Sequence, residues 1–138
     1  MDQLIIESKL DSLYRCIKRL KEKTPREKEK LLNDIDLQDI IAVNLVRAVQ
    51  IAVDIGAHII AKSEEPPPSN MGQAFTRLET LQIISTTTAK SMRSAVGFRN
   101  ISVHSYDDID WDIVWSIITL HIDDFRKYAS EVSHYYEL

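Results

Sequence analysis

The sequence contains few residues that reverse the direction of a chain: three glycines and four prolines among 138 residues. A sandwich or barrel of short strands needs many turns, and turns are built mainly from these residues, so an all-β fold is excluded. Gly56, Gly72 and Gly97 are also too far apart to form a glycine-rich phosphate-binding loop. What remains is one domain of a few long helices, since this length is ordinary for a single domain.

Cysteine is the second residue type that is scarce in the sequence. Cys16 is the only one, so an internal disulfide is excluded, and neither a signal peptide nor a membrane-length apolar run is expected. These absences predict a soluble cytoplasmic protein that does not enter a membrane. Cys16 lies in an amphipathic helical pattern without a catalytic dyad nearby, and we interpret it as a packing residue.

Hydrophobic spacing predicts an all-α, up-and-down bundle of about five helices, forming a single domain over residues 1–138. A long segment that reaches Lys62 is apolar around much of its circumference, which indicates burial at the centre of a bundle or at a subunit interface. Thr24-Pro25-Arg26-Glu27 resembles the capped start of that long helix. The expected helices cover residues 2–23, 24–62 with a bend near 33–36, 71–85, 89–104 after a β-branched break at 86–88, and a last helix capped by Asp110.

Charge is distributed unevenly along the chain. The net charge of −4 argues against a general nucleic-acid binder, which normally has a basic surface. However, residues 15–30 carry eight basic side chains against three glutamates, a net charge of +5, whereas residues 105–138 carry −6. No carboxylate occurs between Glu79 and Asp107. The sequence therefore predicts a local positive site within an acidic protein.

The carboxylate-free stretch contains the segment GFRNISVHSY at residues 97–106. It offers the permanent cation of Arg99, the amide of Asn100, the imidazole of His104 and the phenol of Tyr106, a set suited to phosphoryl chemistry. Arg99 and His104 lie about 140° apart around an ideal helix, so they share one phosphate only if the arginine curls back, the helix ends early or a second subunit contributes. The structural alternative is that His104 binds helix-end carbonyls while Arg99 pairs with an acid on the last helix.

RNISVHSY resembles the R-x4-H-x-Y signature of HEPN-domain proteins of the HepT type. The resemblance covers most of the chain, including Leu37-Gln38-Asp39, residues 44–58 and the segment that leads from Val103 into Asp110. It implies a HEPN-like helical bundle that dimerises through its motif-bearing face, so that two motifs face one cleft.

The resemblance also implies a function: the toxin of a type VII-like toxin–antitoxin pair, a metal-independent endoribonuclease that needs no cofactor. Arg99 and His104 are then catalytic, Asn100 supports Arg99, and a cognate minimal nucleotidyltransferase antitoxin silences the toxin by attaching AMP to Tyr106. The expected partners are RNA, this antitoxin and a second copy of the chain, with a larger hetero-oligomer as an extension. Lys90 and Arg93 are the expected additional RNA contacts.

Three alternatives stay open. The acidic segment 107–112 suggests a metal site, but aspartates are also typical of helix N-termini, and we favour capping. The basic run 15–30 is typical of a solvated face; contact with RNA phosphates or with an acidic antitoxin surface is the other reading. Finally, the chain fits a non-catalytic helical subunit that binds substrate for, or scaffolds, a separate nucleotidyltransferase.

Overall fold

The computed structural model describes residues 2–138, which form helices joined by short connections. The α-helices are α1 (Asp2–Lys23), α2 (Lys28–Asn33), α3 (Ile35–Ala61), α4 (Met71–Thr80), α5 (Thr86–His104), α6 (Trp111–Ser116) and α7 (Ile122–Tyr135). A 3-10 turn, η1 (Tyr106–Asp108), follows α5, and a π-helical turn, η2 (Ile117–His121), joins α6 to α7. The predicted all-α, up-and-down bundle is confirmed, with five longer helices and two short ones.

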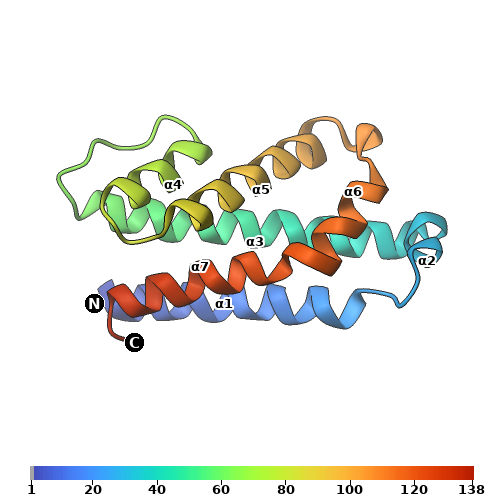
Figure 1. The fold of residues 1–138 in the computed structure, drawn as a ribbon, viewed down its shortest axis with the longest axis horizontal. Helices are drawn as coiled ribbons and strands as arrows, with labels where there is room; N and C mark the ends of the chain where they lie inside the picture. The colour runs from blue at the N-terminus through green and yellow to red at the C-terminus, as the bar shows by residue number, and fades with distance from the viewer. Residues whose placement is uncertain (1) are drawn as a thin grey trace.

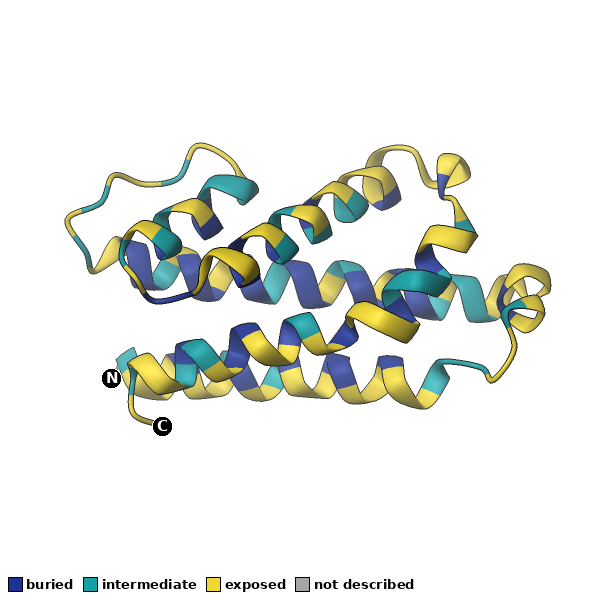
Figure 2. Ribbon diagram, viewed as in Figure 1, coloured by how far each residue is buried: buried dark blue, intermediate teal, exposed yellow. Residues whose placement is uncertain are grey.

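Helix α3 is the centre of the bundle. Figure 1 shows it between the pair α1 and α7 on one side and the pair α4 and α5 on the other, and it contacts all four. Contrary to expectation, α3 is long and apolar enough to cross a membrane, but half of its most apolar stretch is buried inside the bundle. Buried positions recur along α3, α1 and α7 (Figure 2). Central burial therefore accounts for the buried half of this stretch, whereas Ile35 and Val43 of α3 stay exposed.

The connection after α1 differs from the predicted capped start of a helix. The hydroxyl of Thr24 donates a hydrogen bond to the carbonyl of Leu20 at 2.8 Å, so Thr24 closes the end of α1. Helix α2 begins only at Lys28, and Glu27 before it supplies no side-chain cap. The predicted capped helix start at residues 24–27 is wrong because the Thr24 hydroxyl already binds the preceding helix.

The bend predicted near residues 33–36 is a complete break between α2 and α3. Asp34 has an extended backbone, and its carboxylate accepts a hydrogen bond from the Leu37 amide at 3.1 Å, which caps α3. Across the break, the side-chain amide of Gln38 donates to the carbonyl of Leu31 at 3.0 Å. Backbone polar groups on both sides of the break thus find hydrogen-bond partners nearby.

Helix α4 is shorter than predicted. Its start agrees with the sequence, since the side chain of Asn70 accepts a hydrogen bond from the amide of Gln73 at 2.9 Å. Its end at Thr80 falls short of the expected residue 85. Gln82 adopts a left-handed backbone with φ of 60°, a conformation that stops a right-handed helix.

The predicted break at residues 86–88 is also wrong, because these threonines form the first turn of α5. Ser85 caps this turn by accepting a hydrogen bond from the Thr88 amide at 3.1 Å. The carboxylate of Glu131, on α7, accepts hydrogen bonds from the Ser85 amide at 2.7 Å and from the Thr88 hydroxyl. A contact from a distant helix therefore overrides the weak helix preference of β-branched residues.

The last helical segment begins as predicted and then departs from a regular helix. The carboxylate of Asp110 caps α6 by accepting from the Asp112 amide at 3.0 Å, in agreement with the capping interpretation. The π-helical turn η2 then shifts the register before α7. Fully buried Tyr128 fixes α7 to the core, since its hydroxyl donates to the carbonyl of Ala52 at 2.8 Å.

Candidate active site

The motif occupies the last turns of α5 and the 3-10 turn that follows it. Buried side chains on α5, among them Met92, Val96 and Ser102, hold one side of the helix against the bundle. The other side leaves Asn100 and His104 exposed. The polar groups of the motif are thereby presented outward from a fixed helix rather than from a loop.

Arg99 is half-buried at the side of α5. One terminal nitrogen, Nη1, donates a hydrogen bond to Oδ1 of its neighbour Asn100 at 3.2 Å. Its Nε atom is buried and has no hydrogen-bond partner within residues 2–138. The other terminal nitrogen, Nη2, makes no hydrogen bond within residues 2–138 and is not a buried atom, so it is the donor suited to bind an anion such as phosphate.

His104 is the final residue of α5 and is exposed. The helix ends with the Ser105 amide donating to the carbonyl of Ile101 at 2.8 Å, so that helix-end carbonyl is satisfied by the backbone. In the part of the chain that the structure describes, the imidazole makes neither a hydrogen bond nor an ion pair. Within residues 2–138, neither contact of the structural alternative occurs: His104 does not bind carbonyls, and Arg99 does not pair with an acid.

Tyr106 begins the turn after α5. Its hydroxyl donates a hydrogen bond to the carboxylate of Asp39, near the start of α3, and its ring lies edge-on to Trp111 with centroids 6.1 Å apart. Burial raises the pKa of Tyr106 to about 12, and the hydrogen bond to Asp39 and the charges of Asp39 and Asp107 act in the same direction. The phenol is therefore held in one place and stays protonated at neutral pH.

The other predicted site residues lie farther back along α5. Arg93 forms an ion pair with Glu79 of α4 at 3.4 Å, so part of its charge is already used. Lys90 is exposed and lines a pocket of about 520 Å³ between α5 and the α6–η2 segment. A Cβ added at Gly97 would meet nothing within 4 Å, so the space beside Gly97 is open within this chain.

No metal-binding group emerges among residues 2–138, since no three His, Cys, Asp or Glu side chains lie together there. Two of the four aspartates of segment 107–112 are engaged: Asp110 caps α6, and Asp112 forms an ion pair with Lys28 at 2.9 Å. The motif itself contributes the cation of Arg99, the imidazole of His104 and the phenol of Tyr106.

Two residues near the site were not predicted from the sequence. Asp39 was part of the resemblance but had no assigned role, because its contact with Tyr106 joins residues 67 positions apart. Arg47 also went unnoticed, although it is the only lysine or arginine within α3, a signal in itself on an apolar helix. It lies beside Arg15 and Arg19 along a groove between α1 and α3.

Comparison with known proteins assigns the chain to a family. The family described as ribonuclease HepT-like matches residues 13–132. The chain belongs to this family. The HepT-like chain is 31% identical to the mRNA nuclease HepT of Shewanella oneidensis over 128 residues, which cover 93% of the chain and 96% of that protein. It is 29% identical to the tRNA nuclease HepT of Aphanizomenon flos-aquae over 135 residues, 98% and 92% of the two chains.

The HepT-like fold is shared with a solved toxin–antitoxin structure. A tri-AMPylated Shewanella oneidensis HEPN toxin in complex with an MNT antitoxin superposes with a TM-score of 0.88 at 29% identity, covering 94% of this chain and 97% of that one. The resemblance stated from RNISVHSY, the HEPN-like bundle and the expectation of an endoribonuclease are confirmed at the level of the family.

Proposed function

We propose that this HepT-like chain is the toxin of a toxin–antitoxin pair and acts in the cytoplasm as a metal-independent endoribonuclease. The observation that carries the proposal is the exposed end of α5, where Arg99 has unmatched donors and His104 has no protein partner within residues 2–138. The mRNA and tRNA nuclease relatives support RNA as the substrate class.

The proposed mechanism uses the chemistry of RNA itself. A ribose 2′-hydroxyl attacks the adjacent phosphate, which breaks the P–O5′ bond and leaves a 2′,3′-cyclic phosphate and a 5′-hydroxyl. The imidazole of His104 moves a proton to or from the reacting oxygens, near neutral pH. The guanidinium of Arg99 stabilises the negative charge that develops on the phosphate, and Asn100 holds one of its nitrogens in place.

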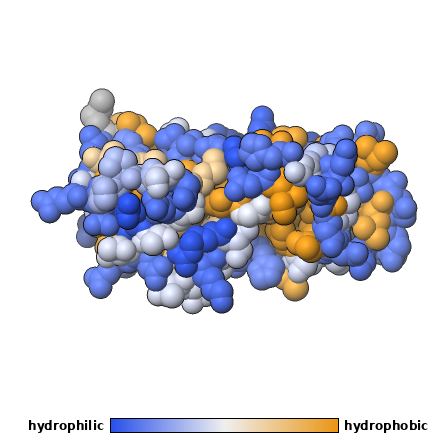
Figure 3. Space-filling model, turned by 90° about the horizontal axis from the view of Figure 1, so that it is seen from above, coloured by the Kyte–Doolittle hydropathy of each residue, from blue (hydrophilic) through white to orange (hydrophobic). Residues whose placement is uncertain are grey.

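A homodimer completes the proposed site. Arg99 and His104 point in directions about 140° apart on α5, so the two side chains of one subunit do not naturally meet on one phosphate. Ile101 and Val103, interleaved with the motif, are 46% and 49% exposed, and apolar surface gathers where α5 ends and α6 begins (Figure 3). A second copy packed on this apolar surface brings Arg99 of one subunit near the motif of the other.

The proposed partner is a minimal nucleotidyltransferase antitoxin that attaches AMP to Tyr106. The tri-AMPylated toxin bound to an MNT antitoxin supports this assignment. Tyr106 follows His104 by two residues, so AMP on its hydroxyl adds a bulky anion where an RNA phosphate has to approach. Silencing would then combine steric block with charge repulsion.

Growth arrest distinguishes a toxin from a scaffold subunit. Expression of the chain without its partner is expected to arrest growth, and His104→Ala is expected to abolish the arrest because no proton can then be moved. His134→Ala is the matched control, since His134 is also exposed but lies near the end of α7. Arrest that persists in His104→Ala, or no arrest from the wild-type chain, contradicts the proposal.

A further inference from the structure

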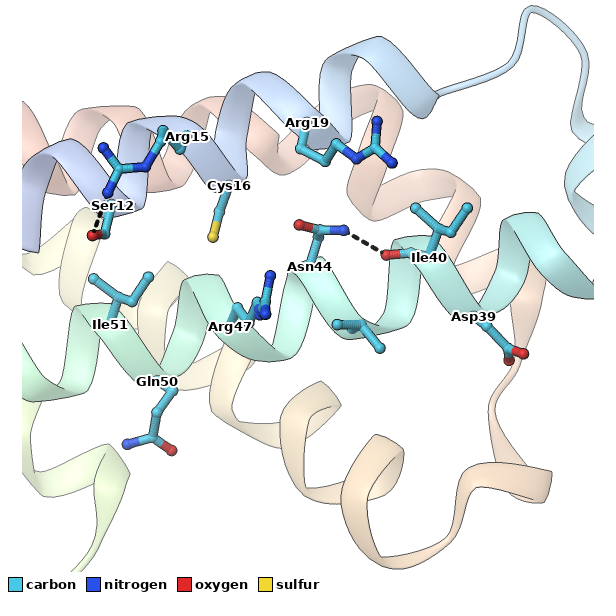
Figure 4. A pocket seen from close by; sticks show the side chains of 11 residues that line it. Ser12, Arg15, Cys16, Arg19, Asp39, Ile40, Asn44, Arg47, Gln50 and Ile51 are labelled. Carbon is cyan, nitrogen blue, oxygen red and sulfur yellow. Dashed lines mark hydrogen bonds between the residues drawn. The ribbon is translucent and has the colours of Figure 1, made fainter.

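A groove of about 870 Å³ runs between α1 and α3. Arg15 and Arg19, one helical turn apart on α1, and Arg47 on α3 line its rim, and all three are exposed (Figure 4). Its floor contains the buried side chains of Cys16 and Asn44, which point toward each other's helices. The groove thus combines an arginine rim with a floor that is closed by packing.

The positive charge of this arginine groove is not neutralised from within. Among residues 2–138, none of the three guanidiniums forms an ion pair, and Arg15 only donates to the Ser12 hydroxyl at 2.9 Å. The one lining carboxylate, Asp39, points away from α1 and accepts the hydrogen bond of Tyr106. Three cations beside one engaged anion form a local binding surface for negative charge, despite the net charge of −4.

The geometry separates the basic run 15–30 into two sets. Only Arg15 and Arg19 line the groove, whereas Lys21 and Lys28 form ion pairs with aspartates at 3.0 and 2.9 Å on other faces. All three basic groove residues are arginines. A planar guanidinium matches two oxygens of a phosphate at once, which a lysine ammonium does not do.

The floor of the groove also retains hydrogen-bonding capacity. Asn44 is only 8% exposed, and its Nδ2 donates to the carbonyl of Ile40 at 2.8 Å. Its Oδ1 accepts no hydrogen bond from any residue in the described range 2–138. Burial raises the pKa of the Cys16 thiol, while the positive charges of Arg47 and Arg15 oppose that shift. The unpaired Oδ1 is not among the fully buried polar atoms. An accessible acceptor below cations suits a ligand that carries both phosphates and hydroxyls.

We propose that the arginine groove between α1 and α3 binds the sugar–phosphate backbone of single-stranded RNA that extends from the cleavage site. Arg15, Arg19 and Arg47 contact phosphates, and Oδ1 of Asn44 accepts a hydrogen bond from a ribose hydroxyl. This inference rests on the proposed ribonuclease function. Asp39 connects the groove with the motif, because this residue borders the groove and its carboxylate binds Tyr106.

The groove favours RNA over an acidic protein surface. Apolar side chains of Ile40 and Ile51 also line it, and such surfaces together with guanidinium planes accept stacked bases. Arg47 and Asp39 are eight residues apart on α3, a rise of about 12 Å. Arg47 therefore lies about two helical turns along α3 from the residue that binds Tyr106. A chain of regularly spaced phosphates matches this series of cations.

Binding of a labelled, unstructured, single-stranded RNA tests the inference. Fluorescence anisotropy is measured over about 50 to 200 mM salt in the His104→Ala background, which prevents cleavage. The triple variant Arg15→Gln, Arg19→Gln, Arg47→Gln is expected to lose at least about tenfold in affinity, and the slope of log affinity against log salt is expected to shrink by about 2. The corresponding triple Arg→Lys variant is expected to retain the slope.

The matched control removes three charges elsewhere. Lys18→Gln, Arg26→Gln, Lys30→Gln affects three exposed residues outside the groove, and it is expected to leave the slope unchanged. RNA affinity and slope that stay at wild-type values in the groove variant overturn the inference. It is also overturned if that variant keeps RNA binding but loses binding to the antitoxin or to a second copy.

Cleavage measured separately distinguishes the two claims. If the chain with His104 cleaves RNA and the groove variant binds and cleaves equally well, the groove inference fails while the ribonuclease proposal stands. If the chain binds RNA through the arginines but never cleaves it, the ribonuclease proposal fails and the groove inference stands. Circular dichroism and urea unfolding of each variant confirm that the bundle is intact.

Discussion

The hydroxyl of Tyr106 donates a hydrogen bond to the carboxylate of Asp39, which joins the turn after α5 to the start of α3 across 67 residues of sequence. This bond connects three parts of the account. It fixes the residue that the antitoxin is proposed to modify, it lies two residues beyond His104, and its acceptor lines the arginine groove. Modification of Tyr106 would therefore act on the catalytic motif and on the RNA path together.

Asp39→Asn is expected to lower the pKa of Tyr106 from its value of about 12. The substitution removes the negative charge and weakens the hydrogen bond, both of which raise that pKa, while the larger contribution of burial remains. NMR titration of Cζ-labelled tyrosine measures the change. Asp36→Asn is the control, an exposed carboxylate one turn earlier on α3, and it should leave Tyr106 unaffected. An unchanged pKa in Asp39→Asn means that the carboxylate does not act on the phenol.

The raised pKa of Tyr106 also predicts a pH dependence of stability. In the unfolded chain the phenol ionises near 10, whereas in the folded chain it stays protonated until about 12. The stabilisation that the raised pKa gives to the folded chain is therefore complete below pH 10 and is lost as the pH rises toward 12. Urea unfolding of wild type and Tyr106→Phe should show curves that converge over this interval. A difference that stays constant from pH 9 to 12 contradicts the assignment.

Tyr106→Phe is expected to prevent modification by the antitoxin. The variant keeps the ring that lies against Trp111 but lacks the oxygen that would bond to the α-phosphorus of ATP and displace pyrophosphate. Mass spectrometry after incubation with the partner and ATP should show AMP on the wild-type chain and none on the variant. Tyr135→Phe serves as the control, because Tyr135 is 53% exposed and lies at the end of α7. AMP mapped to another residue, with Tyr106→Phe still neutralised, refutes the expectation.

Glu131 is expected to stabilise the helix that carries the motif. Its carboxylate accepts hydrogen bonds from the Ser85 amide and the Thr88 hydroxyl at the start of α5. Glu131→Ala leaves both donors without this partner and should lower the free energy of unfolding by about 1–2 kcal/mol. Urea unfolding measures the loss. Glu7→Ala, an exposed carboxylate on α1, should change stability by less than about 0.5 kcal/mol, and an equal effect of both variants would show that Glu131 has no capping role.

The sequence predicted those elements whose structure is decided locally. The stripe of apolar residues over 2–23 gave both ends of α1, and Asp110 caps α6 as expected. The predicted helix boundaries were wrong where a side chain could bind either of two partners. Thr24 bonds backwards to Leu20, and Glu131 reaches from α7 to make residues 86–88 helical. The spacing of apolar residues predicts neither contact, because each depends on which side chains pack nearby in the folded chain.

The candidate site shows the same division. Arg99, Asn100, His104 and Tyr106 were recognised because they lie within one short segment. Asp39 and Arg47 join the site only through packing of α3 against η1 and α1. The net charge did not predict the groove either, since a chain with a total charge of −4 still gathers three arginines along it.

Cleavage of RNA in excess EDTA tests the central claim most directly. The wild-type chain is expected to cut RNA in chelator and to leave 2′,3′-cyclic phosphate and 5′-hydroxyl ends, because Arg99 and His104 supply the charge stabilisation and the proton transfer. Arg99→Ala and His104→Ala should each lose at least about a hundredfold in rate, and His134→Ala should lose little. Loss of wild-type cleavage in EDTA, or full activity in both motif variants, would contradict the account.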